Sequence, residues 1–256
     1  MLYVCPTPIG NLGDLTLRVA DVLAAVELVA CEDTRHTGRL LAHLGIETRL
    51  LSYQEHNERE RLGLLLPLLR EGRDVALVTD AGMPGISDPG FVLVRACRDE
   101  GLPVTVLPGP SSVETALVAS GLPSDRFTFV GFLPRERSRL VSFVESAGAG
   151  GGSVVAFESP RRLPTTLRLL AQRWPDRELA VCRELTKLHE EVVRGPASQV
   201  QAQVGEHVRG EVVLVLAPVA DRGPGAHGGG AAEEGEQGPG DERDAALRVT
   251  LAALLQ

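Results

Sequence analysis

The stretch LVTDAGMPGISDPG, residues 77–90, decides the fold. Strand-forming residues run from 74 to 79, and a loop rich in proline and glycine follows Asp80-Ala81-Gly82. Asp88 and Pro89 then fit a helix start, with aspartate as the N-cap and proline in the first helical position. A strand, a loop and a helix in this order are typical of an open parallel sheet, which binds ligands at the carboxyl ends of its strands. A tight turn without a ligand is the alternative for any single loop of this kind.

Two further loops have the same character. Residues 2–5 form a predicted strand, the loop 6–14 follows, and apolar residues then recur at helical spacing up to Val26. The predicted strand 103–107 leads into a turn in which Ser111 and Glu114 have the spacing of a capping box. Such a turn at a helix N-terminus suits an anionic ligand. The first loop lacks the G-x-G-x-x-G fingerprint, so a nicotinamide or flavin site is not supported.

Ionisable residues crowd the end of another short strand. Residues 28–31 run into EDTRHT, which brings Glu32, Asp33, Arg35 and His36 together. One interpretation is a capped helix start with solvated charges, in which Asp33 or Thr34 is the cap. The other is a polar wall of an active site, which we favour because the residues follow a strand's carboxyl end.

The pattern restarts after Gly121, and we place a domain boundary there. Strands are predicted at 127–131, 154–157, 178–182, 191–194 and 211–217, with antiparallel pairing among the later ones. Helices are predicted after Pro134, from Ser159 as N-cap with Pro160 following, and over 196–204. The predicted domains are residues 1–121 and 122–217. Residues 218–243 are predicted to be a flexible linker of glycine and acidic residues, and 244–256 a short terminal helix.

Composition excludes several classes of protein. The net charge is −8, with −4 carried by residues 218–256, so binding of nucleic acid through an overall positive field is not supported. The apolar runs are strand-sized and no signal peptide opens the chain, which predicts a cytoplasmic protein without membrane contact. The cysteines are scattered within apolar patterns, which predicts buried free thiols and no metal site. They are Cys5, Cys31, Cys97 and Cys182.

Seven motifs, in order over residues 2–217, resemble the ribosomal RNA small subunit methyltransferase I family. They are PTPIGNLGDLTLR, CEDTRHTGRLL, TDAGMPGISDPG, LPGPSS, GLPSDRFTFVGFLPR, FESPRRL and CRELTK. The resemblance implies two α/β domains of the tetrapyrrole-methylase type, the first with a mostly parallel doubly wound sheet and the second with a mixed sheet. It also implies a homodimer that transfers a methyl group from S-adenosylmethionine to the 2′-oxygen of a cytidine in 16S rRNA. Met83 and Gly85 depart from the family's central loop, and the C-terminal extension is short.

The cofactor is expected in a cleft between the domains, because strand-end loops gather on one edge of a sheet. The residues expected to bind it are Ile9, Gly10, Asp80, Ala81, Gly82, Ile86, Ser87, Pro108, Gly109, Ser111, Ser112, Phe157, Glu158, Arg183 and Glu211. A ribose hydroxyl needs a proton acceptor, for which Glu32, Asp33, His36 and Glu184 are candidates. Glu32 and Asp33 rank first because of the cluster at the strand end.

Positive charge for RNA is expected to be local. The predicted RNA contacts are Arg35, His36, Arg135, Arg137, Arg139, Arg161, Arg162 and Lys187. The arginines at 135–139 and 161–162 precede or lead predicted helices, where cations oppose the macrodipole unless an anion is present. Solvated arginines set by genome composition are the alternative.

Two other functions stay open on the sequence. One is a methyltransferase of the same fold that acts on a small molecule, such as a tetrapyrrole, or on a protein. The other is a non-catalytic nucleotide- or RNA-binding module, since a fold does not fix a function.

Overall fold

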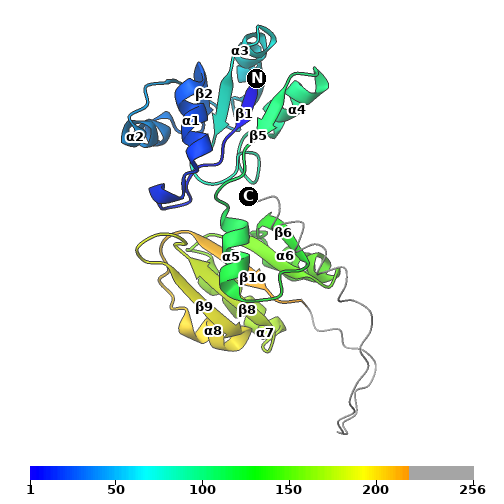
Figure 1. The fold of residues 1–256 in the computed structure, drawn as a ribbon. Coiled ribbons are helices and arrows are strands. Elements are labelled where there is room, and N and C mark those ends of the chain that lie inside the picture. Colours follow the sequence, from blue (N-terminus) through cyan, green and yellow to red (C-terminus); the bar gives the residue numbers. More distant parts are fainter. Residues whose placement is uncertain (219–256) are drawn as a thin grey trace, which may run out of the picture. The chain divides into compact units, whose positions relative to one another are not determined.

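The first sheet of the molecule is parallel throughout. The computed structural model describes residues 1–218, and its first five strands lie in the order β3-β2-β4-β1-β5 (Figure 1). Every pairing among them is parallel, so their carboxyl ends meet at one edge. The strands are β1 (Leu2–Val4), β2 (Leu28–Cys31), β3 (Arg49–Ser52), β4 (Val75–Val78) and β5 (Val104–Val106).

Helices cover both faces of this sheet. Side chains alternate between the faces of a strand. Val75 and Leu77 of β4 therefore pack with α3 (Glu58–Arg70) and α4 (Phe91–Asp99). Ala76 and Val78 instead pack with α1 (Leu17–Ala25) and α2 (Thr34–Leu44). All four residues of β4 are buried, as expected for a central strand of a doubly wound sheet.

The second sheet is mixed, and its strands lie in the order β6-β7-β10-β8-β9. β6 and β7 are parallel, whereas β10 pairs antiparallel with both β7 and β8, and β8 pairs antiparallel with β9. The strands are β6 (Phe127–Phe132), β7 (Ser153–Glu158), β8 (Glu178–Arg183), β9 (Glu191–Pro196) and β10 (Val212–Leu216). The predicted fold class, a parallel doubly wound sheet followed by a mixed one, is confirmed.

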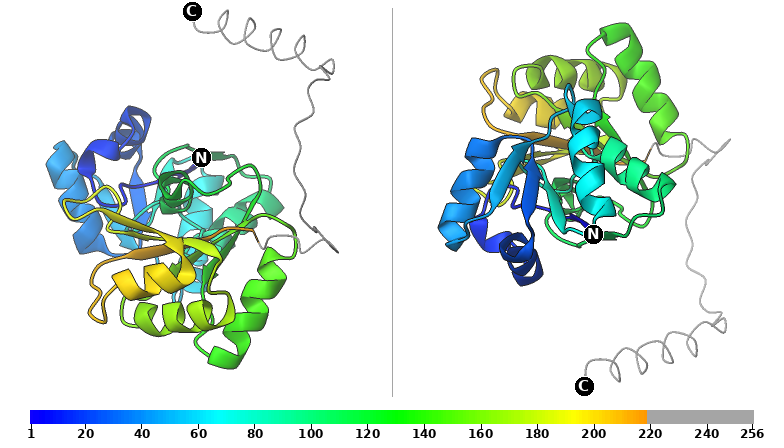
Figure 2. Two further views of the ribbon diagram at one scale, coloured as in Figure 1. Left: turned by 90° about the horizontal axis from the view of Figure 1, so that it is seen from below. Right: turned by 90° about the horizontal axis from the view of Figure 1, so that it is seen from above.

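The two faces of the second sheet carry different helices. Helices α6 (Arg137–Gly148), α7 (Leu163–Arg173) and α8 (Ala197–Gln203) lie side by side on one face (Figure 2). The other face carries α5 (Ser112–Ser120), whose Val113, Ala116 and Leu117 pack against Val213 and Val215 of β10. Helix α5 thus follows a strand of the first sheet but completes the core of the second. The domain boundary at residue 121 stays a prediction.

Two helices begin later than the sequence predicts. Gly90, not Asp88, is the N-cap of α4, and its amide donates to the buried Glu58 carboxylate at 2.9 Å. Asp88 is held in the preceding loop instead. In the second case α7 begins at Leu163, because Ser159 starts a turn in which its carbonyl accepts from the amides of Arg162 and Leu163. Proline near a helix start correctly marks a boundary in both cases, but the helix itself begins after a further turn.

The described residues also bear on the remaining sequence predictions. All four cysteines are buried and free, and within residues 1–218 no cluster of three histidine, cysteine or acidic side chains is arranged to hold a metal. No helix among these residues is long and apolar enough to cross a membrane. The predicted linker 218–243, apart from its first residue, and the predicted terminal helix 244–256 lie outside the described residues.

Candidate functional site

A cavity of about 420 Å³ lies where loops from both sheets meet. The first sheet contributes the loops after β1, β4 and β5, and the second contributes the ends of β6, β7 and β8 and the start of β10. The predicted cofactor residues in its lining are Ile9, Ala81, Gly82, Ile86, Ser87, Ser111, Ser112, Phe157, Glu158 and Glu211. The strand-end loops therefore gather most of the predicted cofactor residues around one cavity, as expected for this edge of a parallel sheet.

A short bridge between two loops shapes the floor of the cavity. Thr7 and Gly82 exchange both backbone hydrogen bonds at 3.0 Å, and the Thr7 hydroxyl donates to the Thr79 carbonyl at 3.0 Å. Gly82 has a φ of 75°, a left-handed conformation that glycine adopts without strain. The loop after β4 is thereby fixed to the loop after β1 beneath the cavity.

The outer part of the same loop is fixed by a buried acid. Glu58, at the start of α3, is buried and accepts from the Gly90 amide. A Cβ at Gly90 would come within 3.0 Å of a Leu77 methyl and 3.1 Å of the Gly85 amide, so this turn is closely packed. Ser87 precedes it with a φ of 61°, which is unusual for a residue with a side chain. These constraints hold Ser87 and Asp88 in the cavity lining.

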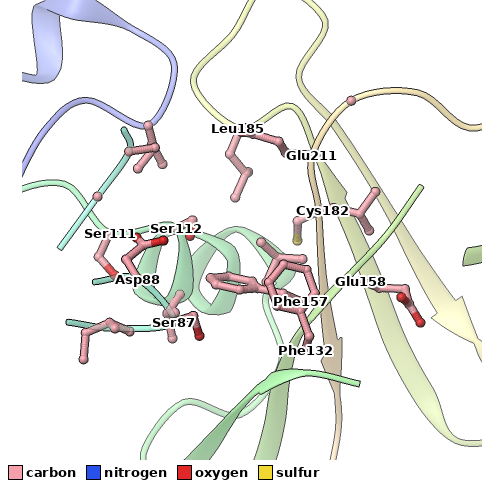
Figure 3. Close-up of a pocket in the computed structure, with 18 of the residues that line it drawn as sticks. Ser87, Asp88, Ser111, Ser112, Phe132, Phe157, Glu158, Cys182, Leu185 and Glu211 are labelled. Atoms are coloured by element: carbon pink, nitrogen blue, oxygen red, sulfur yellow. The ribbon is translucent and has the colours of Figure 1, made fainter. Parts of the chain in front are cut away.

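Aromatic side chains form the opposite wall. Phe157 packs edge-on against Phe129 and Phe132, with ring centroids 4.9 and 5.5 Å apart. Figure 3 shows the rings of Phe157 and Phe132 together. Phe132 is 62% exposed at the end of β6, so most of its ring is available to a ligand. Together with Ile9 and Leu185, these rings make an apolar, partly enclosed surface of the kind that binds a flat organic ring.

The N-terminus of α5 supplies backbone donors. Ser111 is the N-cap residue and Ser112 begins the helix, and both line the cavity. The capping box predicted for Ser111 and Glu114 does not form, because the Ser111 hydroxyl donates to the Glu114 side chain and caps no backbone amide. The first amides of the helix have no intrahelical acceptor. These amides and the helix dipole favour a negatively charged group.

Two of the three acidic residues in the lining form ion pairs with basic side chains. The Glu158 side chain is fully buried and bound by Arg162, the Thr166 hydroxyl and the Ser159 amide. In Figure 3 its carboxylate points away from the phenylalanine rings. Glu211 pairs with Lys187 at 2.8 Å across the cavity's other rim.

The third acid, Asp88, has no such partner among the described residues. Burial raises its pKa to about 7, with further contributions from the negative charges of Glu32 and Asp80, and a hydrogen bond with Thr79 opposes the shift. The pKa of Glu32 is also raised, by burial and by Asp80. The negative charges of Glu32 and Asp80 thus add to the effect of burial on Asp88.

The two predicted catalytic acids lie outside the lining. Asp33 caps α2 and pairs with Arg35 at 3.0 Å, and hydrogen bonds from the Arg35 side chain and amide hold its pKa at about 2. The Asp33 amide donates to the Asp80 carboxylate at 3.2 Å. Asp80 therefore binds the backbone of the segment after β2, and it does not line the cavity. Glu32 follows β2 and does not line the cavity. The catalytic role of Glu32 and Asp33 stays a prediction that the geometry does not favour.

Other predicted cofactor residues serve the packing of the loops. A Cβ at Gly10 would overlap the Lys187 side chain at 2.5 Å, and one at Gly109 would overlap the Pro6 ring at 2.4 Å. Glycine at position 10, and at position 109 directly after Pro108, allows the loops to pack closely. Arg183 pairs with Glu191 at 2.9 Å on neighbouring strands. None of these residues lines the cavity.

The predicted RNA contacts fall into two groups. Arg135, Arg137, Arg139 and Arg161 are exposed, and they follow the ends of the parallel strands β6 and β7 that border the cavity. Arg139 also pairs with Glu136 at 3.0 Å on the surface. Arg162 is instead engaged by Glu158 and by the Leu133 and Pro134 carbonyls. Lys187 bridges Glu184 and Glu211. On the first sheet Arg35 pairs with Asp33, and His36 lies 3.4 Å from Arg39.

Several lining residues were not among the predicted site residues. They are Met83, Asp88, Val113, Phe132, Ser159, Pro160, Cys182, Leu185, Gly210, Val212 and Val213. All lie in or beside strand-end loops that the sequence did identify. Extending each predicted site to its whole loop would have found most of them, whereas Phe132 gave no signal beyond its place at a strand end.

Comparison with known proteins shows the family. The sequence profile described as Tetrapyrrole (Corrin/Porphyrin) Methylases matches residues 1–201. A protein named Ribosomal RNA small subunit methyltransferase I from Hydrogenobaculum sp. (strain Y04AAS1) is 47% identical, covering 84% of this chain and 94% of its own. The proteins of the same name from Escherichia coli O157:H7 and Thermotoga maritima are 45% and 44% identical, each over 84% of this chain and over 77% and 97% of their own.

Solved structures agree with this assignment. Uroporphyrin-III-C-methyltransferase from Thermus thermophilus has a TM-score of 0.57 at 26% identity, over 85% of this chain and 94% of that one. The methyltransferase CobJ shares the fold, with a TM-score of 0.63 at 19% identity over 88% of this chain and 96% of its own. The resemblance expected from the seven motifs is confirmed, and the chain belongs to the tetrapyrrole methylases and, within them, to the ribosomal RNA small subunit methyltransferase I family.

Proposed function

We propose that this protein transfers a methyl group from S-adenosylmethionine to the 2′-oxygen of a cytidine ribose in 16S rRNA. The observation that carries the proposal is the cavity of about 420 Å³ where strand ends of both sheets meet. The chain that forms it is 47% identical to a protein named as an rRNA methyltransferase. Its lining combines aromatic rings, free helix amides and a carboxyl group in one space. A ribosomal substrate also implies the cytoplasm.

The residues present fit the chemical groups of S-adenosylmethionine. The rings of Phe132 and Phe157 offer stacking surface for an adenine, and the first amides of α5 suit the carboxylate of the amino acid part. Asp88 is the acid left without a cation among the described lining residues, which suits a positively charged ligand. When bound, the cofactor supplies an electrophilic methyl group.

The protein's own contribution is to hold the acceptor and exclude water. Methyl transfer requires the hydroxyl oxygen to approach the methyl carbon in line with the bond that breaks. Holding the two reactants in this orientation lowers the activation barrier by up to ~7–11 kcal/mol. Ile9, Ile86 and Leu185 keep the lining apolar around the reacting groups. The bridge between Thr7 and Gly82 and the anchor between Glu58 and Gly90 fix the loop that carries Asp88.

The exposed arginines beside the cavity support an RNA substrate. Because β6 and β7 are parallel, the segments after both strands leave from one edge, and they place four exposed arginines near the lining residues Phe132 and Pro160. An acidic protein with a net charge of −8 can engage phosphates in this way through a local patch. The arginines are Arg135, Arg137, Arg139 and Arg161.

A homodimer is part of the proposal. Leu17 and Leu188 are 85% and 93% exposed, and Val118 on the outer side of α5 is 75% exposed. Large apolar side chains left in water are a common sign of an interface. Sedimentation at micromolar concentration should show a dimer. Detection of monomer alone would contradict the proposed homodimer.

Methyl transfer to three classes of acceptor tests the function. The protein is incubated with methyl-labelled S-adenosylmethionine and either small ribosomal subunits from a strain lacking the activity, a tetrapyrrole, or total cell protein. Label should enter only the subunits, in the RNA fraction. Label in the tetrapyrrole or in protein would instead support a small-molecule or protein methyltransferase. Cofactor binding without transfer to any acceptor would support a non-catalytic module.

A further inference from the structure

Two phenylalanine rings beside the cavity are left largely exposed to solvent. Aromatic side chains are few in this chain, which has six Phe, two Tyr and one Trp. Phe91 and Phe132 are 67% and 62% exposed, and the next most exposed aromatic residue, Phe127, is 39% exposed. Rings of this size usually bury their surface in a core or an interface, so two of them in water beside one cavity indicate a surface for a partner.

A β-bulge brings Phe132 to the cavity. Phe129 of β6 lies opposite Val155 of β7. Phe132 lies opposite Phe157, three residues further along β6 but only two further along β7, and Gly131 in the bulge has a φ of 66°. Because side chains alternate along a regular strand, Phe129 and Phe132 would lie on opposite faces without the extra residue. The bulge puts both rings on one face, where both contact Phe157 and where Phe132 lines the cavity (Figure 3).

The other ring, Phe91, is held on the side of the first sheet. It is the first residue of α4 and follows the loop after β4, which contributes Ser87 to the cavity lining. Gly90, directly before it, is fixed by the Glu58 carboxylate at 2.9 Å. The same loop reaches the second sheet, because a Cβ on Gly131 would lie 3.4 Å from the Ser87 hydroxyl oxygen. The segments that carry the two rings therefore meet at the entrance of the cavity, and both are held in fixed conformations.

Exposed arginines follow directly after one of these rings. Arg135 and Arg137 lie three and five residues beyond Phe132, and Arg161 follows the neighbouring parallel strand β7. All three arginines are exposed. Flat apolar rings beside guanidinium groups suit a polyanion that carries flat rings of its own. Single-stranded RNA is such a ligand, since it offers phosphates to the cations and unstacked bases to the rings.

A nucleotide whose ribose enters the cavity has to leave its stack. The cavity lies between loops of two sheets, so the nucleotides stacked on either side of the acceptor in a regular helix would meet its rim. Unstacking costs free energy, and an aromatic surface at the entrance offsets this cost by stacking on the exposed bases.

We propose that Phe91 and Phe132 form a stacking platform for unpaired bases of the RNA around the acceptor nucleotide, while the arginines after β6 and β7 bind its phosphates. This inference rests on the function proposed above. The platform leaves room for the cofactor, because Phe91 does not line the cavity and an adenine needs only one face of Phe132. Specificity for single-stranded RNA then comes from the rings, and the salt dependence of binding comes from the arginines.

The test compares three replacements of Phe91, by alanine, leucine and tryptophan, with the parent and with Phe127→Ala. Phe127 lies at the other end of β6 and outside the cavity lining, so it controls for the loss of an exposed ring. Fluorescence anisotropy measures binding of a labelled oligocytidine of about ten nucleotides and of an abasic ribose-phosphate strand of the same length.

Stacking on an aromatic side chain strengthens binding about 5- to 150-fold per base. Phe91→Ala should therefore bind the oligocytidine more weakly by about this factor, and the abasic strand as tightly as the parent does. Phe91→Leu, which keeps an apolar side chain but no ring, should lose most of the same affinity, whereas Phe91→Trp should keep it. Phe132→Ala should weaken oligocytidine binding in the same way. Phe127→Ala should match the parent.

Methyl transfer to small ribosomal subunits gives a second measurement. Phe91→Ala should raise KM for the subunits by a similar factor, while the dissociation constant for S-adenosylmethionine in calorimetry stays within a few-fold. The salt dependence of RNA binding should keep the slope of the parent, because no phosphate contact is lost. This unchanged slope distinguishes the rings from the arginines.

The possible results separate the platform from its alternatives. Parent affinity of Phe91→Ala for the oligocytidine, or an equal loss on the abasic strand, would overturn the platform, and so would a parent that does not prefer the oligocytidine. Full affinity of Phe91→Leu would show an apolar contact without stacking and would also overturn it. A change from dimer to monomer in sedimentation of Phe91→Ala would assign the ring to an interface between two copies instead.

The two assays also separate this inference from the proposed function. A parent that methylates no ribosomal subunit overturns the proposed function, and the oligonucleotide measurements still decide whether the rings bind bases. An active parent with an unaltered Phe91→Ala variant overturns the platform alone. Should Phe91→Ala not fold, Phe91→Leu decides the question in the same assays.

Discussion

Replacing Arg162 by alanine should destabilise the protein strongly, whereas the same change at the neighbouring Arg161 should not. The Glu158 carboxylate is 0% exposed, and Arg162 contacts both of its oxygens at 3.0 Å. Alanine at position 162 would leave this charge buried with only the Thr166 hydroxyl and the Ser159 amide, each at 2.6 Å. Breaking a buried ion pair on one side costs about 3–5 kcal/mol.

Equilibrium unfolding in urea at pH 7.5 measures the effect. Arg161 is exposed and makes no contact that the fold depends on among the described residues, so Arg161→Ala should change the free energy of unfolding by less than about 0.5 kcal/mol. Glu158→Gln combined with Arg162→Ala should recover part of the stability, because no charge is then left unpaired. Equal stability of the two arginine variants would refute this interpretation of Glu158 and would return Arg162 to the RNA-binding set.

Three further predictions concern the cavity and its rim. Because the folded-state pKa of Asp88 is raised to about 7, its ionisation costs folding free energy above that pH and the cost disappears toward pH 4. Asp88→Asn should therefore be more stable than the parent at pH 8, by at most roughly 4 kcal/mol in the free energy of unfolding, and should unfold at a higher temperature. This stability difference should shrink toward pH 5, and a difference that stays constant with pH would contradict the charge argument. Glu58→Ala should weaken S-adenosylmethionine binding in calorimetry while Glu58→Gln, which keeps an acceptor for the amide at the start of α4, should retain most of it. Alanine at the three exposed arginines of the α6 segment should leave cofactor affinity intact and flatten the salt dependence of rRNA binding by roughly one unit of slope for each phosphate that is no longer bound, and an unchanged slope would move the RNA site elsewhere; these residues are Arg135, Arg137 and Arg139.

Local patterns in the sequence were sufficient for most of the fold. Buried strands such as β4 and β10 are short continuous apolar runs, and a helix such as α1 shows a clear apolar stripe, so element type could be predicted. The position of α5 could not. Its sequence is apolar on more than one side, and only the tertiary structure shows that Ala116 and Leu117 pack on the second sheet.

The site was predictable as a set of loops but not as chemistry. The rule about strand ends located Gly82, Ser111 and Phe157 without knowledge of distances. The choice among acids depended on which of them would find a cation. Asp33 finds Arg35 two residues away, a partner that the sequence shows, whereas Asp88 has no ion-pair partner among the described residues and the nearby Gly90 amide binds Glu58, 32 residues away in the sequence. Such long-range exchange of partners is outside the reach of local patterns.

The position of the methyl group on the RNA tests the central claim most directly. Small ribosomal subunits from a strain lacking the activity are treated with the protein and S-adenosylmethionine, and the 16S rRNA is digested to nucleosides for mass spectrometry. We predict that 2′-O-methylcytidine appears and approaches one residue per 16S rRNA, while the treated sample gains no other methylated nucleoside. A methyl group on a base, on another ribose, or on no nucleoside at all would contradict the account.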